Sequence, residues 1–486
     1  MNVDEVVLLA YIFSLTIILV FASHGFIMLY YHNKYEKNNP RKNDDVLYDK
    51  KVTIQLPLYN ELYVSKRLID SVCSIDYPKE LLEIQVLDDS TDETVKLVAE
   101  VVKQKQHEGF DIKQIRREIR SGFKAGALKE GLKTAKGEYI AIFDADFVPS
   151  PNFLKKTLTF FTDDNVGMVQ TRWEHLNEDY SMLTKVQALA LNGHFVIEQT
   201  VRNKAGFFIN FNGTGGIWKK DCIEDAGNWH ADTLTEDLDL SFRAQLKGWK
   251  FVYLRDYTTP AELPSEMNAL KAQQFRWTKG AIETAKKLLP AVWRSKISLR
   301  VKLQSTFHLT NNIVFPFILV AGILNVPLIF IKNSGPYDNF FNFMAIFVTA
   351  FISSFLFYLY AQKDVHTDWR KKITLFPIFM AGSMGLAVNN TRAVVEGLMS
   401  RKSDFIRTPK FKVVEKKDTI IKNKYLANMK VDASAFVELF LAAYCLIGVV
   451  ASIYFLEIAA LPFQLMFFLG FFLVSALSFK HTIFNK

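Results

Sequence analysis

The chain has 486 residues, half of them hydrophobic, and a formal net charge of +9. A mean hydropathy of +0.08 is high for a soluble protein and low for a bundle of membrane helices, so a mixed architecture is expected. The spacing of Cys73, Cys222 and Cys445 excludes a disulfide framework and a cysteine-based metal site, and no basic run has the aromatic interleaving of a nucleic-acid binder.

The N-terminal segment is predicted to cross a membrane. Val6–Tyr31 is almost uncharged and long enough to span ~30 Å of hydrocarbon at ~1.5 Å per residue. The acidic start, MNVDE, differs from the basic start of a secretory signal, so we expect an uncleaved helix over residues 1–34. The basic flank HNKYEKNNPRK predicts that the N-terminus lies outside and the following chain in the cytoplasm.

The central region alternates between strand-like and helix-like patterns. The strand-like runs are Lys51–Leu56, Glu83–Leu87, Phe110–Ile115 and Tyr139–Phe143, and the helical patterns between them are Val64–Cys73, Glu93–Lys105 and Gly126–Ala135. This alternation predicts an α/β domain over residues 48–262, with a mostly parallel sheet and ligands at the carboxyl ends of its strands.

Polar side chains follow three of these strands. They are Tyr59, Asn60 and Glu61 after the first, Asp88 and Asp89 after the second, and Asp144 and Asp146 after the fourth. In an extended segment Asp144 and Asp146 share one side, which suits a hard divalent cation that substrate phosphates also bind. No GxxxxGK[ST] loop and no GxGxxG after a strand is present, which excludes a P-loop ATPase and an ordinary dinucleotide oxidoreductase.

The stretch DTLTEDLDLSFRAQLKGWK, residues 232–250, predicts a helix. Thr233 and Glu236 fit a capping box, and Gly248 is a plausible terminating residue. Asp237 then lies in the first turn, where the helix dipole favours its ionised form, as suits a proton acceptor. The alternative is that Glu236 and Asp237 only complement the dipole.

The stretch KAQQFRWTKG, residues 271–280, places Gln273, Arg276 and Trp277 on one face if it is helical. An arginine fork and neutral donors suit a diphosphate, and the tryptophan offers a stacking surface for a sugar. The alternative is an amphipathic helix at the membrane surface with Trp277 as an anchor. Both are compatible with amphipathic interface helices over residues 263–305, because an adjoining apolar stripe is available from Leu270, Ala281 and Leu288.

The C-terminal region, residues 306–480, contains apolar runs of membrane-spanning length. They are Asn312–Ile331, Phe341–Tyr360, Phe376–Val394, Ala435–Phe455 and Leu461–Ser478. The third carries Asn389, Asn390 and Arg392, and if it crossed, the lysine-rich loop 401–430 would lie outside, against the positive-inside tendency. We therefore expect residues 374–400 to be interfacial or re-entrant, giving five spans in all, with six as the alternative.

The ordered set DDS, DAD, TED and QQFRW resembles the D, DxD, TED and QxxRW signature of processive family 2 glycosyltransferases, a group that includes cellulose, hyaluronan, chitin and glucomannan synthases. The resemblance covers roughly Lys51–Lys410. RSGFKAGALKEGL resembles the K-A-G-x-L segment of the family, and FNGTGGIWKK and NTRAVVEGL resemble its glucomannan-synthase-like branch. FIRTPK is similar to the gating-loop pattern FxVTxK, with Phe405, Thr408 and Lys410 matching and Arg407 replacing the valine.

The resemblance implies a GT-A-type fold and a role for each matching residue. Nucleotide contacts are implied for Tyr59, Glu61, Asp88, Asp89, Lys124, Asp144, Gln273 and Arg276. Asp144 and Asp146 would bind Mg²⁺ or Mn²⁺, and Asp237 would be the general base. Acceptor contacts are implied for Trp277, Phe211, Gly213, Thr214 and Glu236.

The implied activity is inverting transfer from UDP-glucose or GDP-mannose that elongates, and exports, a β-linked polysaccharide. The implied location is an integral membrane protein with lipid contacts and a cytoplasmic catalytic domain. Two alternatives stay open at this stage. One is a non-processive transferase that adds a single sugar to a lipid, and the other is a nucleotide-sensing transporter, against which sparse intramembrane charge and the lack of evident inverted repeats argue.

Overall fold

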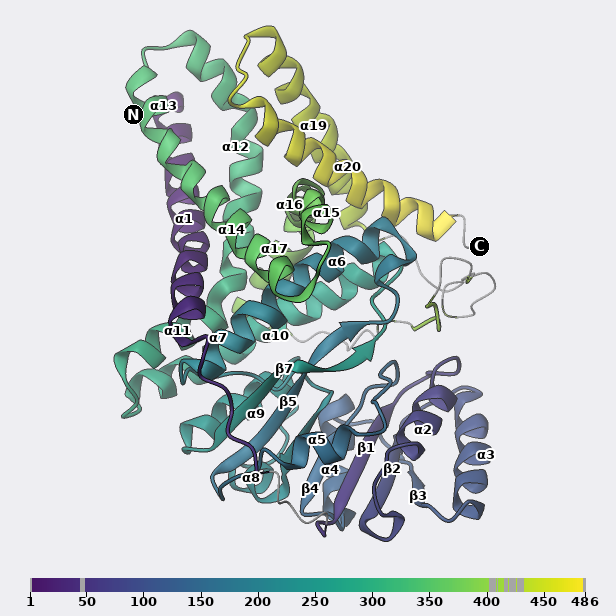
Figure 1. Ribbon diagram of the computed structural model, residues 1–486. Coiled ribbons are helices and arrows are strands. Elements are labelled where there is room, and N and C mark those ends of the chain that lie inside the picture. Colours follow the sequence, from purple (N-terminus) through teal and green to yellow (C-terminus); the bar gives the residue numbers. More distant parts are fainter. Residues whose placement is uncertain are drawn as a thin grey trace.

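The structure is a computed structural model that describes residues 2–43, 49–401, 408, 410–414, 418, 425 and 432–483. The chain forms three levels (Figure 1): a sheet domain, a layer of interface helices that includes α10, and a group of long apolar helices. The N-terminal helix α1, Val3–Tyr35, belongs to the apolar group and leads into the sheet domain.

Within the described part of the chain, the sheet domain contains seven strands in the order β3-β2-β1-β4-β6-β5-β7. Their bounds are Val52–Leu58 (β1), Leu82–Asp88 (β2), Asp111–Ile115 (β3), Tyr139–Ile142 (β4), Val166–His175 (β5), Gly216–Lys219 (β6) and Lys250–Ala261 (β7). β1 to β4 pair in parallel, β6 is antiparallel to both of its neighbours, and β5 and β7 are parallel. The predicted, mostly parallel α/β sheet is therefore confirmed.

Helices cover both faces of this sheet, because side chains alternate along each strand. In β4, Ala141 belongs to the hydrophobic cluster on one face, and Ile140 and Ile142 to the cluster on the other. The first face is covered by α2 (Ser65–Cys73), α3 (Thr94–His107) and α5 (Phe153–Leu158). The second is covered by α4 (Phe123–Thr134), α8 (Lys220–Asp225) and α9 (Glu236–Leu246).

The interface layer joins the sheet domain to the apolar helices. It consists of α6 (Met182–Asn192), a π-helical turn (Gly193–Glu198), α7 (Gln199–Lys204), α10 (Met267–Arg294) and α11 (Leu299–Thr310). Two buried ion pairs attach α10 to apolar helices: Lys271 Nζ lies 2.8 Å from a carboxylate oxygen of Glu438, and Lys279 Nζ lies 3.2 Å from one of Glu396. These two contacts connect α10 to α19 and α17.

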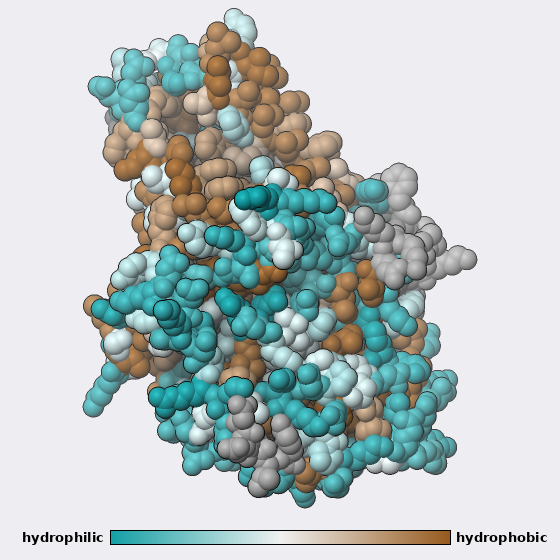
Figure 2. All heavy atoms as spheres, in the orientation of Figure 1, coloured by the Kyte–Doolittle hydropathy of each residue, from teal (hydrophilic) through white to brown (hydrophobic). Residues whose placement is uncertain are grey.

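Among the described residues, five helices are long and apolar enough to cross a membrane: Val3–Tyr35, Leu299–Ser334, Asp338–Val365, Ser434–Tyr454 and Leu461–Thr482. They contain α1, α11–α12 (α12 Val314–Ser334), α13–α14 (Asp338–Met344 and Val348–Val365), α19 (Ser434–Tyr454) and α20 (Leu461–Ile483). Figure 2 shows that brown, hydrophobic residues dominate this part of the surface.

The predicted interfacial segment forms a bent pair of helices. The first helix, Trp369–Gly385, contains α15 (Trp369–Lys372) and α16 (Phe376–Gly385). The chain bends by 46° between this helix and α17 (Ala387–Leu398). Counted as one span, this pair would raise the number of candidate spans to six. The polar residues Asn389 and Asn390 on α17 are buried rather than exposed to lipid, and Asn389 donates a hydrogen bond to the carbonyl of Lys271 in α10.

Candidate active site

A pocket of about 1290 Å³ opens where the strand ends of the sheet meet the interface helix α10. Most residues singled out in the sequence line it, although they come from segments more than 300 residues apart. They are Tyr59, Glu61, Asp89, Lys124, Asp144, Asp146, Gly213, Glu236, Asp237, Gln273, Arg276, Trp277, Thr408 and Lys410. Polar residues that follow successive strands therefore lie together at one edge of the sheet.

One end of the pocket is built from the segments that follow β1 and β2. Arg117 donates two hydrogen bonds to the Asp89 carboxylate, of 3.0 and 2.5 Å, and the Arg120 guanidinium lies 3.5 Å from the centre of the Tyr59 ring. A stacked guanidinium and ring form a flat surface, and Asp89 is held in one orientation by a bidentate pair. Flat surfaces next to a fixed carboxylate suit a nucleoside.

Asp144 and Asp146 each contact a lysine. Lys124 Nζ lies 2.5 Å from Asp144 Oδ1, and Lys410 Nζ lies 2.7 Å from Asp146 Oδ2. Although burial disfavours the charged amines, these carboxylates raise the pKa of both lysines. Two carboxylates that already hold cations suit Mg²⁺ or Mn²⁺, whose preferred ligands in proteins are carboxylate oxygens.

The two aspartates reach the pocket in a different way from the one expected. They were predicted to share a side because a strand alternates, but β4 ends at Ile142 and a turn follows in which the amide of Phe147 donates to the carbonyl of Asp144. The amide of Asp144 in turn donates to Thr214 Oγ1 at 2.8 Å. The turn and this hydrogen bond therefore orient the pair.

Asp237 lies in the first turn of α9, as predicted, but the predicted capping box is wrong. The helix begins at Glu236, and its N-cap is Thr235, whose side chain makes no capping hydrogen bond. The predicted cap, Thr233, lies two residues too early in the chain. Burial, together with the charge of Glu236, raises the pKa of the Asp237 carboxyl to about 7. A carboxyl with a pKa near neutrality is suited to accept and release protons.

A loop glycine brings the backbone close to Asp237. Gly213 has a φ of +78°, and an added Cβ would lie 3.0 Å from Asp237 Oδ2 and 3.4 Å from Lys124 Nζ. Its carbonyl accepts a 2.8 Å hydrogen bond from Lys124. Glycine is the residue type that readily adopts this φ and also fits the space between the backbone, Asp237 and Lys124. The pocket, and not the packing of the core, therefore requires glycine at position 213.

The QQFRW segment is helical, as predicted, and turns Gln273, Arg276 and Trp277 towards the pocket. Leu270, Ala281 and Leu288, the predicted apolar stripe, are all buried within the protein. Gly280 lets α10 approach the start of α9, because an added Cβ there would lie 2.6 Å from Thr235 Cγ2 and 2.9 Å from its amide nitrogen. This close approach sets Arg276 beside Glu236 and Asp237.

Gly280→Ala tests this close approach. Alanine stabilises an isolated helix by about 1 kcal/mol relative to glycine, so the substitution itself favours α10. Its methyl group nevertheless needs space that Thr235 occupies, which forces the two helices apart. We expect turnover to fall by about 10²-fold, the typical cost of a 1 Å displacement in an active site.

A matched control for this variant is available in α16. Gly382→Ala places the same methyl group more than 4 Å from any other described part of the chain outside its own helical turn, and we expect wild-type turnover. Circular dichroism should show unchanged helix content in both variants. Equal turnover in the two would contradict the role given to the contact between Gly280 and Thr235.

Part of the predicted gating-like segment lies in the pocket. Thr408 is buried and lines the pocket with Lys410, and the amide of Lys412 donates to Glu262, a carboxylate that also pairs with Arg67. Further along, the Tyr425 hydroxyl donates to Asp92 at 2.6 Å. Phe405, the first matching position, lies outside the described residues.

Three predicted site residues do not reach the pocket surface. Asp88 is fully buried and accepts hydrogen bonds from the amide of Ser90 and the side chain of Gln114. Phe211 is buried against Trp218, with ring centres 5.5 Å apart. Thr214 is buried and supports Asp144 through its hydroxyl. These residues shape the loops that carry the pocket and do not line it.

Five residues that sequence reasoning missed also belong to the site: Arg117, Arg120, Trp173, His175 and Glu262. All except Arg117 line the pocket, and Arg117 acts through Asp89. Trp173, His175 and Glu262 lie at the ends of β5 and β7. The stretch TRWEH after an apolar run was a usable signal, because it forms the carboxyl end of a strand.

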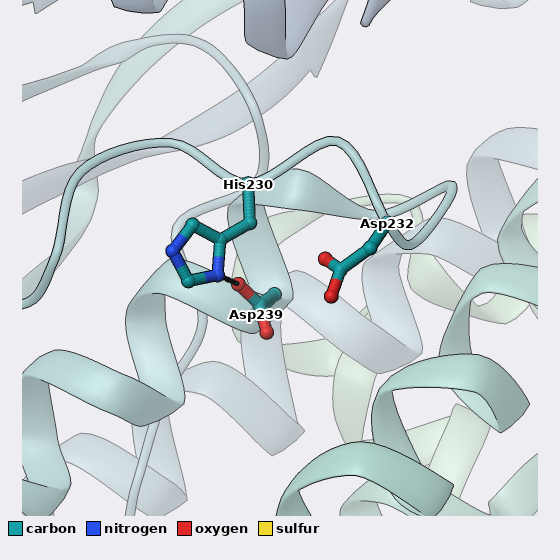
Figure 3. A group of neighbouring side chains, drawn as sticks. All are labelled: His230, Asp232 and Asp239. Atoms are coloured by element: carbon teal, nitrogen blue, oxygen red, sulfur yellow. Dashed lines mark ion pairs between the residues drawn. The ribbon is translucent and has the colours of Figure 1, made fainter.

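A second group of possible metal ligands lies next to the pocket. His230, Asp232 and Asp239 gather near the start of α9, and His230 Nδ1 is 3.7 Å from Asp239 Oδ2 (Figure 3). Lys287 Nζ lies 2.8 Å from Asp232 and 2.9 Å from Asp239, and Arg243 also pairs with Asp239 at 2.7 Å. None of these three residues lines the pocket at the strand ends, so we assign this group no part in the substrate site.

The family model described as glycosyltransferase-like family 2 matches residues 50–280. A probable glucomannan 4-beta-mannosyltransferase (number 10) of Arabidopsis thaliana is 34% identical over 398 residues, which cover 80% of this chain and 69% of the relative. The chain belongs to glycosyltransferase family 2. The resemblance inferred from the D, DxD, TED and QxxRW motifs is thereby confirmed.

Other relatives match over a shorter part of their length. Glucomannan 4-beta-mannosyltransferase 2 of Arabidopsis thaliana is 44% identical over 250 residues, which cover 50% of this chain and 47% of the relative. Glucomannan 4-beta-mannosyltransferase 1 of Oryza sativa is 40% identical over 278 residues, with coverages of 56% and 52%. The chain thus spans about half the length of these curated relatives.

A solved structure supports the fold. A mannosyltransferase of Pyrobaculum calidifontis, in complex with GDP-mannose and Mn²⁺, aligns with a TM-score of 0.55 at 18% identity, covering 80% of this chain and all of that one. Together with the family match, this likeness identifies the sheet domain as a GT-A-like fold, as the resemblance implied.

Proposed function

We propose that this chain is an inverting glycosyltransferase that elongates a β-linked polysaccharide from a nucleotide-diphospho-sugar. The observation that carries the proposal is that Asp89, Asp144, Asp146, Asp237 and Arg276 line one pocket although they come from four separate segments. Such a set provides a nucleoside contact, a cation site, a base and a diphosphate contact within reach of one substrate.

Each group has a distinct task in this proposal. Asp237 accepts the proton of the attacking hydroxyl, while Arg276 and Gln273 hold the departing diphosphate. Trp277 offers its ring to the acceptor sugar. A divalent cation held by Asp144 and Asp146 would neutralise charge on the leaving group. Lys124 and Lys410, which now contact these carboxylates, would be free to turn towards the phosphates.

We propose a mannosyl donor, GDP-mannose, in preference to UDP-glucose. The support is the printed activity of the relatives, which are glucomannan 4-beta-mannosyltransferases. The test is to incubate the purified chain in detergent with a panel of nucleotide sugars plus Mg²⁺ or Mn²⁺ and to measure the released diphosphate. A product digest then distinguishes a β-linked polymer from a single sugar on a lipid. Release from none of the donors would overturn the proposal.

The pH dependence of the reaction should follow Asp237. With a pKa raised to about 7, this carboxyl is protonated below neutrality and cannot accept a proton, so kcat/KM should rise with pH and level off above about 7. Glu236→Gln removes a charge that raises this pKa, so the midpoint should move to lower pH. A pH profile with the same midpoint in Glu236→Gln would contradict the coupling of the two carboxyls.

For location, we propose that the long apolar helices span a membrane with the sheet domain on the cytoplasmic side. The excess of Lys and Arg around residues 32–42 and 286–302 supports this orientation. Proposed boundaries are 1–34 for the first span, 48–262 for the catalytic domain, 263–305 for the interface helices and 306–480 for the remaining membrane region. A donor made on the cytoplasmic side could then enter the pocket directly.

A further inference from the structure

The turn between α10 and α11 combines exposed apolar side chains with positive charge. Trp293, Leu299 and Leu303 are 45%, 62% and 44% exposed. No aspartate or glutamate occurs between residues 284 and 337, whereas residues 293–303 contain four basic side chains, Arg294, Lys296, Arg300 and Lys302. We call residues 293–303 the α10–α11 tip.

Hydrogen bonds across the turn fix the shape of this tip. Lys302 Nζ donates to the carbonyl of Trp293 at 2.8 Å, and Trp293 Nε1 donates to Thr306 Oγ1 at 3.1 Å. Leu299, Leu303 and Thr306 are three or four residues apart and therefore share one face of α11. The bond to Thr306 places the indole along this face. These hydrogen bonds thus hold the exposed apolar side chains in a defined conformation.

Contacts with α1 give the depth of the tip relative to the candidate spans. His24 Nε2 lies 2.8 Å from Gln304 Oε1, and the rings of Phe21 and Phe307 are 5.7 Å apart, so the two helices run antiparallel. One helical turn further along, the start of α11 is level with residues 28–31 of α1. There α1 exposes Tyr30, with Lys34 over its ring. Aromatic and basic side chains at one level are typical of a membrane–water interface.

The length of the adjoining helix agrees with this depth. The continuous candidate span Leu299–Ser334 has 36 residues, whereas about 20 cross a bilayer. A helix of this length extends beyond the hydrocarbon, and the level shared with α1 assigns the excess to the first turns of α11, on the side of the sheet domain. In Figure 1 the turn at α11 lies at the edge of the interface layer, beside the lower end of α1.

Three of the basic side chains at the tip have no acidic partner among the described residues. Arg294, Lys296 and Arg300 form no ion pair within the part of the chain that the structure describes. The preceding lysines differ, because Lys286 donates to the carbonyl of Leu398 and Lys287 pairs with Asp232. The three charges at the tip are therefore available to an external anion.

We propose that the α10–α11 tip binds anionic phospholipid headgroups of the leaflet that faces the catalytic domain. Trp293, Leu299 and Leu303 enter the boundary with the acyl chains, and the basic side chains reach the phosphates around them. Each Lys or Arg near an anionic surface contributes about five-fold in affinity. Because α10 carries Arg276 and Trp277, the tip also fixes the height of the pocket above the membrane.

The test uses the full chain in nanodiscs that contain phosphatidylcholine and roughly a third phosphatidylglycerol, a fraction chosen to give an anionic surface. Electron spin resonance with spin-labelled lipids measures the preference of the protein for phosphatidylglycerol over phosphatidylcholine. The variant Arg294→Gln/Lys296→Gln/Arg300→Gln changes only side chains that pair with no carboxylate in the described ranges of the chain. The matched control, Lys96→Gln/Lys103→Gln/Lys129→Gln, removes the same charge from exposed positions of α3 and α4 in the sheet domain.

We expect the wild-type protein to prefer phosphatidylglycerol, and the preference to weaken with added salt because exposed charges are screened. The tip variant should lose this preference about ten-fold or more, while the control variant keeps it. Equal affinity of the wild type for both lipids, or an equal loss in tip and control variants, would overturn the proposal. The readout needs no enzymatic activity, so it stands apart from the test of the proposed function.

Discussion

Asp237→Asn should abolish turnover while nucleotide binding survives. The amide keeps the shape of the carboxylate but cannot accept a proton, and removal of a well-placed base costs about 10²–10⁴-fold in rate. The groups proposed to hold the donor, Asp89, Asp144 and Arg276, are unchanged. Diphosphate release from the nucleotide sugar measures turnover, and isothermal titration with the nucleoside diphosphate measures binding.

The same variant should fold normally. The pKa of the Asp237 carboxyl is raised to about 7, so above this pH the folded protein carries a buried charge that Asn lacks. At pH 8 the thermal midpoint of Asp237→Asn should therefore be no lower than that of the wild type. Glu236→Gln, which removes the same charge one residue earlier, is the matched control and should lose less activity. Wild-type turnover in Asp237→Asn would refute its assignment as the base.

The regular part of the fold was predictable because its pattern is local. The strand-like runs and helical patterns before residue 144 each agree with one element of the structure to within a few residues, since apolar side chains there face a sheet buried on both sides. β5, β6 and β7 were not predicted. β6 has four residues, which is too short for a clear pattern. β7 continues into the stretch TTPA, and this stretch shows neither alternation nor a long apolar run. Their pairing is set by tertiary contacts.

The pocket residues were predictable where they follow a strand or occupy one helix face. Asp144 and Asp237 were assigned from such positions, and Gln273, Arg276 and Trp277 from a helical spacing that the structure confirms. Sequence spacing could not tell which polar residues at a strand end turn outwards. Asp88 and Asp89 are adjacent, yet Asp88 is buried and accepts a hydrogen bond from Gln114, whereas Asp89 lines the pocket.

Contacts between distant segments account for the rest. Lys410 contacts Asp146 across 264 residues, and Glu438 contacts Lys271 across 167, distances at which no sequence periodicity operates. The capping box at Thr233 failed for a related reason: Thr235 and Thr284 hydroxyls lie 3.1 Å apart, so packing against α10 fixes where α9 begins. Local capping rules give way when a neighbouring helix supplies the contact.

Asp146→Asn should remove metal-dependent activity. The carboxylate is buried and holds Lys410 at 2.7 Å, so it already serves as a cation site. Loss of one carboxylate ligand weakens a divalent site, and a metal that stabilises a leaving group contributes several kcal/mol, or about 10²–10⁴-fold in rate. Binding of Mn²⁺ to the full chain without nucleotide can be measured directly, because the spin resonance signal of the free ion is lost when the ion binds. This measurement separates metal affinity from turnover.

Lys410→Met is the informative counterpart, because the two variants should move metal affinity in opposite directions. Lys410 occupies one oxygen of Asp146, so a cation that binds there must displace the ammonium or share the carboxylate with it. Without this competitor, Mn²⁺ should bind more tightly than in the wild type, even if turnover falls through lost contacts to the diphosphate. Weaker Mn²⁺ binding in Lys410→Met, or unchanged Mn²⁺ binding in Asp146→Asn, would show that the metal ion does not bind the Asp146 carboxylate. The metal ion would then be held by Asp144 and another ligand.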